Sequence, residues 1–250
     1  MALVTGASRS RGIGAAVCRA LAARGADVSF SHWLPYDADF PWAGHAAEPD
    51  ELERELVALG VRAAAIPCDL SKPDAPRRLL DDAESRLGAV GILVNNAAYS
   101  MRDGYEQLDA ATLDAHYAVN VRGTLLLSAE FSRRFSGAGG RIISLTSGQS
   151  LGPMPDELAY AATKGAIEVF TRSLAPAVAA KGITVNAVNP GPTDTGWISP
   201  ELREQFLPLL PMGRVGTPED AARLIAWLAS PEAAWITGQV IHSEGGFLHA

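Results

Sequence analysis

Short apolar runs alternate along the whole chain with longer stretches of helical periodicity, and this alternation limits the folds open to it. The apolar runs predict strands at residues 2–5, 26–31, 61–66, 90–96, 140–147, 182–190 and 239–243. Helical patterns predict helices at residues 12–24, 49–59, 74–87, 108–135, 157–180 and 217–229. The strands lack strict polar alternation, as expected when helices cover both faces of a parallel sheet. Repeated β-α-β units of this kind predict a doubly wound α/β sheet with right-handed crossovers.

Length and composition fit one domain. With 250 residues, 48% of them hydrophobic, the chain can build one sizeable core, and we expect a single domain over residues 1–250. The net charge of -7 argues against a general nucleic-acid or anionic-membrane surface. No apolar run reaches about 18 residues, and the opening "MALVTGAS" leaves no room for a signal peptide. These features predict a cytoplasmic protein with no nucleic-acid or membrane partner.

The sequence contains no recognisable metal-binding pattern. Cys18 and Cys68 lie far apart and lack the spacing of a disulfide framework or a zinc site. The histidines form no H-x-x-x-H or H-E-x-x-H pattern. They are His32, His45, His116, His242 and His249. We therefore expect no metal.

A glycine-rich turn follows the first predicted strand and opens the first predicted helix, in the segment "VTGASRSRGIGAAVC". Gly6, Gly12 and Gly14 stand where a pyrophosphate would meet backbone N–H groups and the positive end of a helix dipole. A tight connection between a strand and a helix also favours glycine for purely conformational reasons. The β-α-β units that follow favour the phosphate-binding interpretation.

Tyr160 and Lys164 stand four positions apart in "LAYAATKGAIEVF". Residues at i and i+4 lie on one side of a helix, so the phenol and the ammonium can converge on one point. A free phenol has a pKa near 10, and proton exchange at neutral pH needs its anion stabilised by about 4 kcal/mol, which a neighbouring ammonium can supply. Taken alone, the pair fits equally well a packed tyrosine beside a solvated lysine.

Four motifs, in order along the chain, make the sequence resemble the short-chain dehydrogenase/reductase family, including its 3-oxoacyl-carrier-protein reductase-like members. The glycine turn resembles T-G-x-x-x-G-x-G, and "CDL" at 68–70 is similar to the adenine-contacting step of the family. "NNAA" at 95–98 matches N-N-A-G except at its last position, and "NPGPTDTGW" resembles the segment on the nicotinamide side. The resemblance covers essentially the whole chain and implies a single-domain Rossmann-type sheet that binds a nicotinamide dinucleotide.

The same resemblance implies a catalytic set of Asn120, Ser147, Tyr160 and Lys164. Tyr160 would protonate a carbonyl oxygen as hydride arrives, or deprotonate the alcohol in reverse. Ser147 would hydrogen-bond the substrate oxygen, Lys164 would also hold the ribose hydroxyls, and Asn120 would anchor a water that passes protons toward Lys164. Taken singly, Ser147 could end its strand through a local hydrogen bond and Asn120 could satisfy buried backbone groups. The occurrence of all four in register favours catalysis.

The same motifs imply which residues bind the cofactor. They are Gly6, Ser8, Arg9, Arg11, Gly12, Ile13, Gly14, His32, Asp69, Leu70, Asn96, Ala97, Ala98, Tyr160, Lys164, Pro190, Gly191, Thr193 and Thr195.

The phosphate turn departs from the family pattern by two extra residues, since five positions separate Gly6 from Gly12 where the pattern has three. The contacts of residues 8–11 are therefore not given by the family pattern. The insertion brings Arg9 and Arg11, whose guanidinium groups could pair with a 2'-phosphate on the adenosine ribose. Solvated loop arginines are the alternative.

The end of the second predicted strand lacks the acid that NAD-binding proteins usually place there. That position falls near His32 and Trp33. Together with the added arginines, its absence favours NADP(H) over NAD(H). Asp37 and Asp39 in the long loop over residues 32–50 could still serve NAD.

Apolar and aromatic side chains beside the catalytic set predict the substrate wall. They are Tyr99, Met101, Leu151, Met154, Trp197 and Phe206. Such a wall suits a hydrophobic or ring-containing carbonyl compound, although the same side chains could simply pack within their loops. We expect the substrate loop over residues 192–212 to move over the substrate.

These features predict an NAD(P)(H)-dependent oxidoreductase that interconverts a ketone and a secondary alcohol. The alternative is a non-catalytic dinucleotide-binding sensor or interaction protein with the same fold. Family members are commonly tetramers or dimers, so we expect a homo-oligomer built through the helices at 108–135 and 157–180. The apolar residues of those helices also fit packing on the sheet. They include Leu125, Leu126, Phe131, Ile167 and Phe170.

Overall fold

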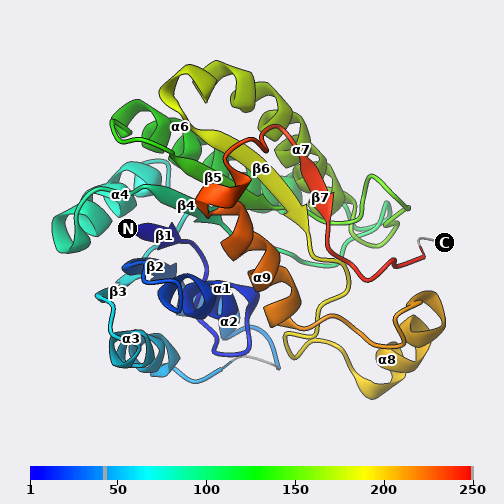
Figure 1. Cartoon of the computed structure of the whole chain (residues 1–250). Coiled ribbons are helices and arrows are strands. Elements are labelled where there is room, and N and C mark those ends of the chain that lie inside the picture. Colours follow the sequence, from blue (N-terminus) through cyan, green and yellow to red (C-terminus); the bar gives the residue numbers. More distant parts are fainter. Residues whose placement is uncertain (42–43, 249–250) are drawn as a thin grey trace.

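A seven-stranded parallel sheet forms the centre of the molecule, with helices on both faces (Figure 1). The computed structural model describes residues 1–41 and 44–248, so His249 lies outside the described residues. The strand order is β3-β2-β1-β4-β5-β6-β7, which confirms the predicted Rossmann-type α/β fold. The strands are β1 (Ala2–Val4), β2 (Val28–His32), β3 (Ala63–Pro67), β4 (Ile92–Asn95), β5 (Arg141–Leu145), β6 (Thr184–Asn189) and β7 (Val240–His242).

The direction in which strands are added reverses between β1 and β4. The chain builds outward from β1 through β2 to β3, then returns to place β4 against the other side of β1. Val4 is thus paired in register with Phe30 of β2 and with Val94 of β4. In doubly wound sheets a crevice opens at the carboxyl ends of the strands where the order reverses. The segments that carry the predicted site residues start from these strand ends.

Successive residues of β1 point to opposite faces of the sheet and enter two separate cores. Leu3 packs on one face of the sheet, whereas Ala2 and Val4 pack on the other. The helices on the first face are α4 (Ala75–Leu87), α6 (Thr124–Arg134) and α7 (Leu158–Val178). Those on the second face are α1 (Ile13–Ala22), α3 (Glu48–Ala58) and α9 (Pro218–Leu228). Burial on both faces explains why the strands read as uninterrupted apolar runs.

The helix predicted at 108–135 is divided into three parts. It comprises α5 (Ala110–His116), a π-helix (Tyr117–Gly123) and α6. Apolar periodicity continues through the wide turn, so the sequence pattern alone does not reveal it. Phe131 and Ile167 are buried, so for these two residues the structure favours the packing alternative over a subunit contact. Leu126 and Val169 are exposed.

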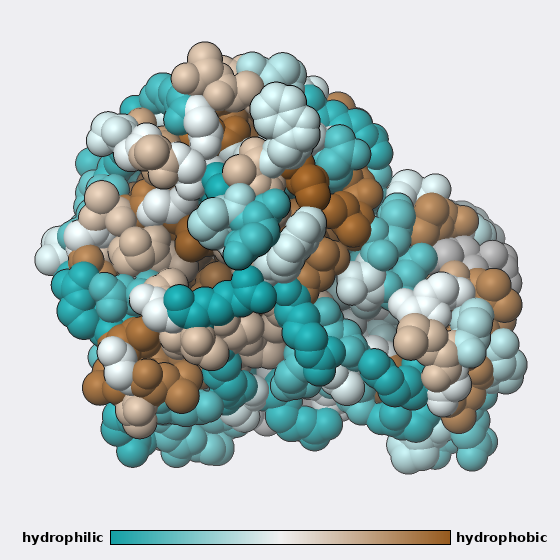
Figure 2. Space-filling view, viewed as in Figure 1, coloured by the Kyte–Doolittle hydropathy of each residue, from teal (hydrophilic) through white to brown (hydrophobic). Residues whose placement is uncertain are grey.

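The two long loops contain short helices that the sequence pattern does not predict. These are α2 (Leu34–Asp37) and α8 (Pro200–Phe206). Short 3-10 turns lie at Ala179–Lys181, Leu207–Leu209 and Pro231–Ala233. The chain around α8 forms a lobe beside the main body (Figure 2). Its small core contains Ile198, Leu210 and Val215. In the part of the chain that the structure describes, no helix has the length and hydrophobicity needed to cross a membrane.

Candidate active site

Tyr160 and Lys164 lie in the first two turns of α7. The ammonium nitrogen of Lys164 lies 5.3 Å from the centre of the Tyr160 ring. It donates a hydrogen bond of 2.8 Å to the carbonyl oxygen of Leu145, the last residue of β5. Lys164 is buried and Tyr160 is half-buried. The structure therefore brings the two predicted catalytic groups together at the carboxyl end of the sheet.

Ser147 joins this pair from the segment that follows β5. Its hydroxyl lies close enough to the Tyr160 side chain to act on the pKa of the phenol, in the direction that favours the phenolate. The sulfur of Met154 lies 3.9 Å from the Ser147 Oγ, so Met154 adjoins the predicted reaction centre. Ser147, Tyr160 and Lys164 form one cluster built from two elements.

Burial moves the pKa values of the two titratable groups away from each other. It raises the pKa of Tyr160 well above 10, an effect that the nearby Glu157 and Tyr36 reinforce. It lowers the pKa of Lys164 from 10.5 to about 8, because removing an ammonium from water disfavours its charged form. The expected lowering of the phenol pKa by its neighbouring ammonium is therefore not found in this structure. At neutral pH the phenol holds its proton and the amine is charged.

Asn120 lies in the π-helix, and its side chain connects three segments. Its Oδ1 accepts a hydrogen bond of 2.7 Å from the Tyr99 backbone, and its Nδ2 donates to the Tyr99 carbonyl over 2.9 Å. The same Nδ2 donates to the Thr163 hydroxyl over 3.0 Å. Thr163 precedes Lys164 on α7, so Asn120 holds the segment after β4 against the catalytic helix. The proton-relay role of Asn120 stays a prediction.

Asp103 caps α7 from outside the helix, and sequence reasoning missed it. Its carboxylate accepts hydrogen bonds from the backbone of Leu158 (2.6 Å) and Ala159 (2.9 Å) at the start of α7. Desolvation alone would raise the pKa of Asp103, but these donors and the backbone N–H of Gly104 together lower it. The cap lies 55 residues before the helix in sequence, so no local capping signature exists.

The phosphate turn is built on close backbone contacts. Gly6 has a φ of 73°, and a Cβ there would lie 2.6 Å from the Cα of Ala97. A Cβ on Gly14 would lie 2.4 Å from the carbonyl oxygen of Gly6. Asn96 binds this turn itself, since its Nδ2 donates to the carbonyls of Thr5 (2.9 Å) and Gly6 (2.8 Å). Asn96 thus fixes the turn from the end of β4.

The amino end of α1 is open to an anion. Its N-cap, Gly12, supplies no side-chain hydrogen bond, and the first turn carries no acidic residue. The N–H groups of a first helical turn have no partner within the helix and attract negative charge. These features fit a pyrophosphate at the glycine turn, with Ile13 as the first residue of the helix.

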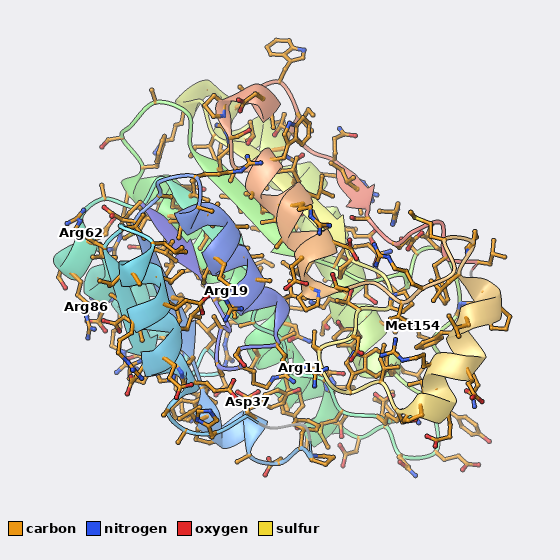
Figure 3. All side chains as sticks on the ribbon, turned by 60° about the horizontal axis from the view of Figure 1, so that its bottom comes forward. Arg11, Arg19, Asp37, Arg62, Arg86 and Met154 are labelled. Atoms are coloured by element: carbon orange, nitrogen blue, oxygen red, sulfur yellow. The ribbon has the colours of Figure 1, made fainter. Side chains whose placement is uncertain are left out.

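The inserted arginines link the phosphate turn to other loops. Arg9 pairs with Asp37 over 3.2 Å and donates to the Thr195 carbonyl over 3.3 Å. Arg11 lies 3.8 Å from Asp194 and its side chain is 71% exposed. Figure 3 shows Arg11 and Asp37 on the same side of α1, with Met154 nearer to α8. The insertion therefore contacts both the 32–50 loop, through Asp37, and the segment after β6, through Asp194 and Thr195.

A cavity of about 550 Å³ lies beside the insertion. Its walls come from the phosphate turn, the 32–50 loop and the segment after β6. They include Arg9, Arg11, Glu48, Thr195, Trp197 and Ser199. The buried carboxylate of Glu48 accepts a hydrogen bond from the backbone of Ser10. Trp197 thus faces the insertion.

The predicted adenosine end contains a buried polar atom without a partner. Within the described residues, the Nδ1 of His32 has no hydrogen-bond partner, and burial lowers the pKa of this imidazole. The Ser8 hydroxyl accepts from the Trp33 backbone over 3.2 Å. Asp69 accepts from the Ser71 backbone over 2.9 Å. The unpaired His32 nitrogen fits a ligand hydroxyl or amine at this position.

The segment after β6 is fixed at its start. Gly191 has a φ of 63°, and a Cβ there would lie 2.4 Å from the Cβ of Glu244. The hydroxyl of Thr193 contacts the carbonyls of Pro190 (3.2 Å) and Gly191 (3.1 Å). The other cofactor-motif residues, Leu70 and Ala98, follow the carboxyl ends of β3 and β4.

The predicted substrate wall divides into two groups. Trp197 packs edge-to-face on Phe206, which belongs to the small core of the lobe around α8. The structure therefore shows Phe206 packing within its own loop. Tyr99 packs edge-to-face on the buried His116, with ring centres 4.8 Å apart. Met101 and Leu151 are exposed.

Tyr36 and His116 hold the segment after β4 through contacts that sequence reasoning missed. The Tyr36 hydroxyl accepts from the backbone N–H of Ser100 over 3.1 Å and donates to its carbonyl over 3.2 Å. The Nε2 of His116 accepts from the Met101 backbone over 3.2 Å. Both side chains hold the segment after β4, and neither stands in a motif that would indicate this. Among the described residues, no cluster of His, Cys, Asp and Glu side chains could hold a metal.

Comparison with known sequences gives matches along almost the whole chain. A family model described as "Enoyl-(Acyl carrier protein) reductase" matches residues 6–248. The "Uncharacterized oxidoreductase YjdA" of Bacillus subtilis (strain 168) is 53% identical over 99% of this chain and 96% of its own length.

Solved structures show the same architecture. The short-chain dehydrogenase/reductase from Serratia marcescens BCRC 10948 matches with a TM-score of 0.89 and 34% identity, over 98% of this chain and 96% of its own. A short-chain dehydrogenase from Burkholderia cenocepacia J2315 in complex with NADP matches with a TM-score of 0.88 and 34% identity, over 98% and 96% of the two chains.

Proposed function

The chain belongs to the short-chain dehydrogenase/reductase family of oxidoreductases, and we propose that it interconverts a ketone and a secondary alcohol by hydride transfer with a nicotinamide dinucleotide. The observation that carries this proposal is the cluster of Ser147, Tyr160 and Lys164 at the carboxyl end of the sheet. A non-catalytic dinucleotide sensor would have no chemical need for all three groups at one point.

The cofactor would lie along the crevice between the glycine turn and the catalytic cluster. The open first turn of α1 fits its pyrophosphate, and the unpaired Nδ1 of His32 fits the adenosine end. Lys164 and the segment from Pro190 to Thr193 would hold the nicotinamide half. When bound, the nicotinamide supplies or accepts the hydride. The protein supplies orientation and the proton.

Tyr160 is proposed as the general acid in ketone reduction. Its raised pKa keeps the phenol protonated at neutral pH, ready to donate to a carbonyl oxygen that gains negative charge. Ser147 would donate a hydrogen bond to the same oxygen and hold the carbonyl in line. The ammonium of Lys164 would stabilise the resulting phenolate. In alcohol oxidation the same phenolate would act as the base.

A Tyr160→Phe variant tests the assigned proton transfer. It keeps the ring and removes the hydroxyl, so NADPH binding should persist while turnover falls by about 10²- to 10⁴-fold. Nicotinamide fluorescence measures the binding, and steady-state ketone reduction measures the rate. An unimpaired rate would contradict the role of Tyr160. If Tyr160→Phe lost ketone reduction but reduced an enoyl thioester as fast as the wild type, the result would instead favour carbon–carbon double-bond reduction.

We propose NADP(H) as the preferred cofactor. Support comes from Arg9 and Arg11 in the insertion, from His32 at a position where NAD-binding proteins usually have an acid, and from the NADP complex of the Burkholderia cenocepacia relative. Arg9 is already paired with Asp37, so a 2'-phosphate would have to replace that carboxylate as its partner. Asp37 and Asp39 are the residues of this loop that could instead serve NAD.

A titration with NADPH and with NADH tests this preference. NADPH should bind at least about tenfold more tightly, a difference of about 1.4 kcal/mol, and an Arg9→Ala/Arg11→Ala variant should lose the difference. Arg77→Ala, on the exposed side of α4, is the matched control. Tighter NADH binding, or a preference unchanged in the double variant, would contradict the proposal. Binding of neither cofactor would contradict the proposed function itself.

The proposed substrate is a hydrophobic or ring-containing carbonyl compound, with an oxoacyl thioester as one candidate. Met154 beside Ser147, and Tyr99 held by Asn120, support an apolar surface near the reaction centre. The protein is proposed to be a homo-oligomer, a tetramer or a dimer, and to act in the cytoplasm.

A further inference from the structure

Glu168 is a buried carboxylate on the catalytic helix that the proposed chemistry does not use. It lies one turn beyond Lys164 and two turns beyond Tyr160, at the same four-residue spacing, and only 4% of it is exposed. Burying a carboxylate costs free energy unless hydrogen-bond donors satisfy it. The identity of those donors therefore indicates what the carboxylate holds.

Three side chains from one short segment surround a single oxygen of this carboxylate. The Nε2 of Gln149 donates to the Oε1 of Glu168 over 2.7 Å, and the Ser150 hydroxyl donates over 3.1 Å. The Thr146 hydroxyl lies 3.3 Å from the same oxygen. Arg172, whose side chain is 58% exposed, lies 3.7 Å from the other oxygen. The closest contacts thus come from the segment that connects β5 to α7.

These donors stand on both sides of Ser147. Thr146 precedes it, Gln149 and Ser150 follow it, and the Thr146 hydroxyl also lies 3.3 Å from the carbonyl oxygen of Lys164. The Ser147 side chain itself has the phenol and a sulfur at 3.9 Å as its partners in the described structure. Its position therefore depends on how its neighbours are held.

We propose that Glu168 is a positioning residue that sets Ser147 against the phenol of Tyr160. The carboxylate acts as a fixed acceptor on the same rigid helix as Tyr160 and Lys164, so the loop and the helix keep one relative placement. Hydride transfer requires the hydroxyl and the phenol to meet one carbonyl oxygen, and a misplacement of about 1 Å can cost about 10²-fold in rate. This inference rests on the proposed function of the Ser147 cluster.

Substitution of Glu168 tests the inference. Glu168→Leu should lower kcat for ketone reduction about 10- to 100-fold, while the NADPH dissociation constant stays within about twofold. Glu168→Gln keeps an acceptor oxygen and should stay within about threefold of the wild type. Arg172→Gln removes only the exposed partner of Glu168 and serves as the matched control, with unchanged kcat. A full rate in Glu168→Leu would overturn the inference.

A double-mutant cycle separates positioning from general stabilisation. If Glu168 acts through Ser147, the Ser147→Ala/Glu168→Leu variant should be within about twofold of Ser147→Ala alone. A further loss in the double variant, multiplying the two single effects, would overturn the inference. Equal rates in wild type and Ser147→Ala would overturn the proposed function as well. Loss in Ser147→Ala with full activity in Glu168→Leu would overturn this inference alone.

A second variant keeps the test valid if Glu168→Leu does not fold. Gln149→Leu/Ser150→Ala removes two donors from the loop and leaves α7 unchanged. It should show the same loss of kcat and the same retained NADPH binding as expected for Glu168→Leu. Unchanged kcat in this variant would also overturn the inference.

Discussion

The ammonium of Lys164 is a charge held in the core, and within the described residues its hydrogen-bond partner is one backbone carbonyl, that of Leu145. Burial lowers its pKa from 10.5 to about 8, and each pKa unit corresponds to about 1.4 kcal/mol. Between pH 8 and 10.5 the unfolded chain binds more protons at this site than the folded one, so stability rises with pH across that window. Below pH 8 the full cost of the buried charge remains.

Lys164→Met should therefore stabilise the protein while abolishing its chemistry. The free energy of unfolding at pH 7 is expected to rise by about 1–3 kcal/mol, because a side chain of similar length replaces a buried charge. The gain should disappear as the pH approaches 10.5. Denaturant unfolding at pH 7 and at pH 10 measures both effects. A variant less stable than the wild type at pH 7 would show that the Leu145 hydrogen bond outweighs the burial of charge.

At the scale of the elements, the catalytic helix depends on a cap from a distant segment. Because the pKa of Asp103 is lowered in the folded state, its contribution is present above the unfolded value near 4 and is lost as the pH falls through the lower folded value. Asp103→Ala should lower Tm at pH 7 by about 2–4 °C, as expected for a loss of about 1 kcal/mol. At pH 3, below the unfolded value, the difference should be smaller.

Asp109 offers a matched control for this prediction. Its side chain caps α5 locally, accepting from Thr112 over 2.7 Å. Asp109→Ala should also lower Tm, but only Asp103→Ala should lower kcat, because Tyr160 lies in the first turns of α7. Thermal unfolding and ketone reduction measured on both variants provide the check. An equal effect of both on kcat would mean that the cap does not act through the catalytic helix.

The elements also divide into those that a sequence can predict and those that it cannot. Long periodic helices and apolar strands follow from local pattern, and the spacing of Tyr160 and Lys164 predicts their convergence. The π-helix, the remote cap of Asp103 and the short helices α2 and α8 depend on tertiary contacts. The pKa of a buried group depends on everything that packs around it. The predicted lowering of the Tyr160 pKa was wrong for this structure because burial raises it.

At the scale of the whole molecule, the outer face of α6 and α7 carries exposed apolar side chains. Leu126 is 40% exposed and Val169 is 63% exposed. Exposed apolar groups on adjacent helices fit a contact between identical subunits. We therefore expect Val169→Glu to shift the protein to a smaller oligomer, because a carboxylate would be desolvated in such a contact.

Light scattering of the purified protein checks this expectation. Val57 on α3 is 52% exposed, so Val57→Glu is a matched control that should leave the mass unchanged. A monomeric wild type, or the same mass in wild type and Val169→Glu, would contradict the proposed use of this face.

The wide turn around Asn120 has a consequence for how this chain can change by insertion and deletion. A π-helical turn bonds residue i to residue i+5 and so holds about one residue more than an α-helical turn. Removing one residue between Tyr117 and Gly123 would let this turn close as an α-helix, and α6 would keep roughly its present phase relative to α5, with Leu127 and Phe131 still buried. Asn120 would lose the position from which it reaches Tyr99 and Thr163, so such a deletion should reduce activity more than stability.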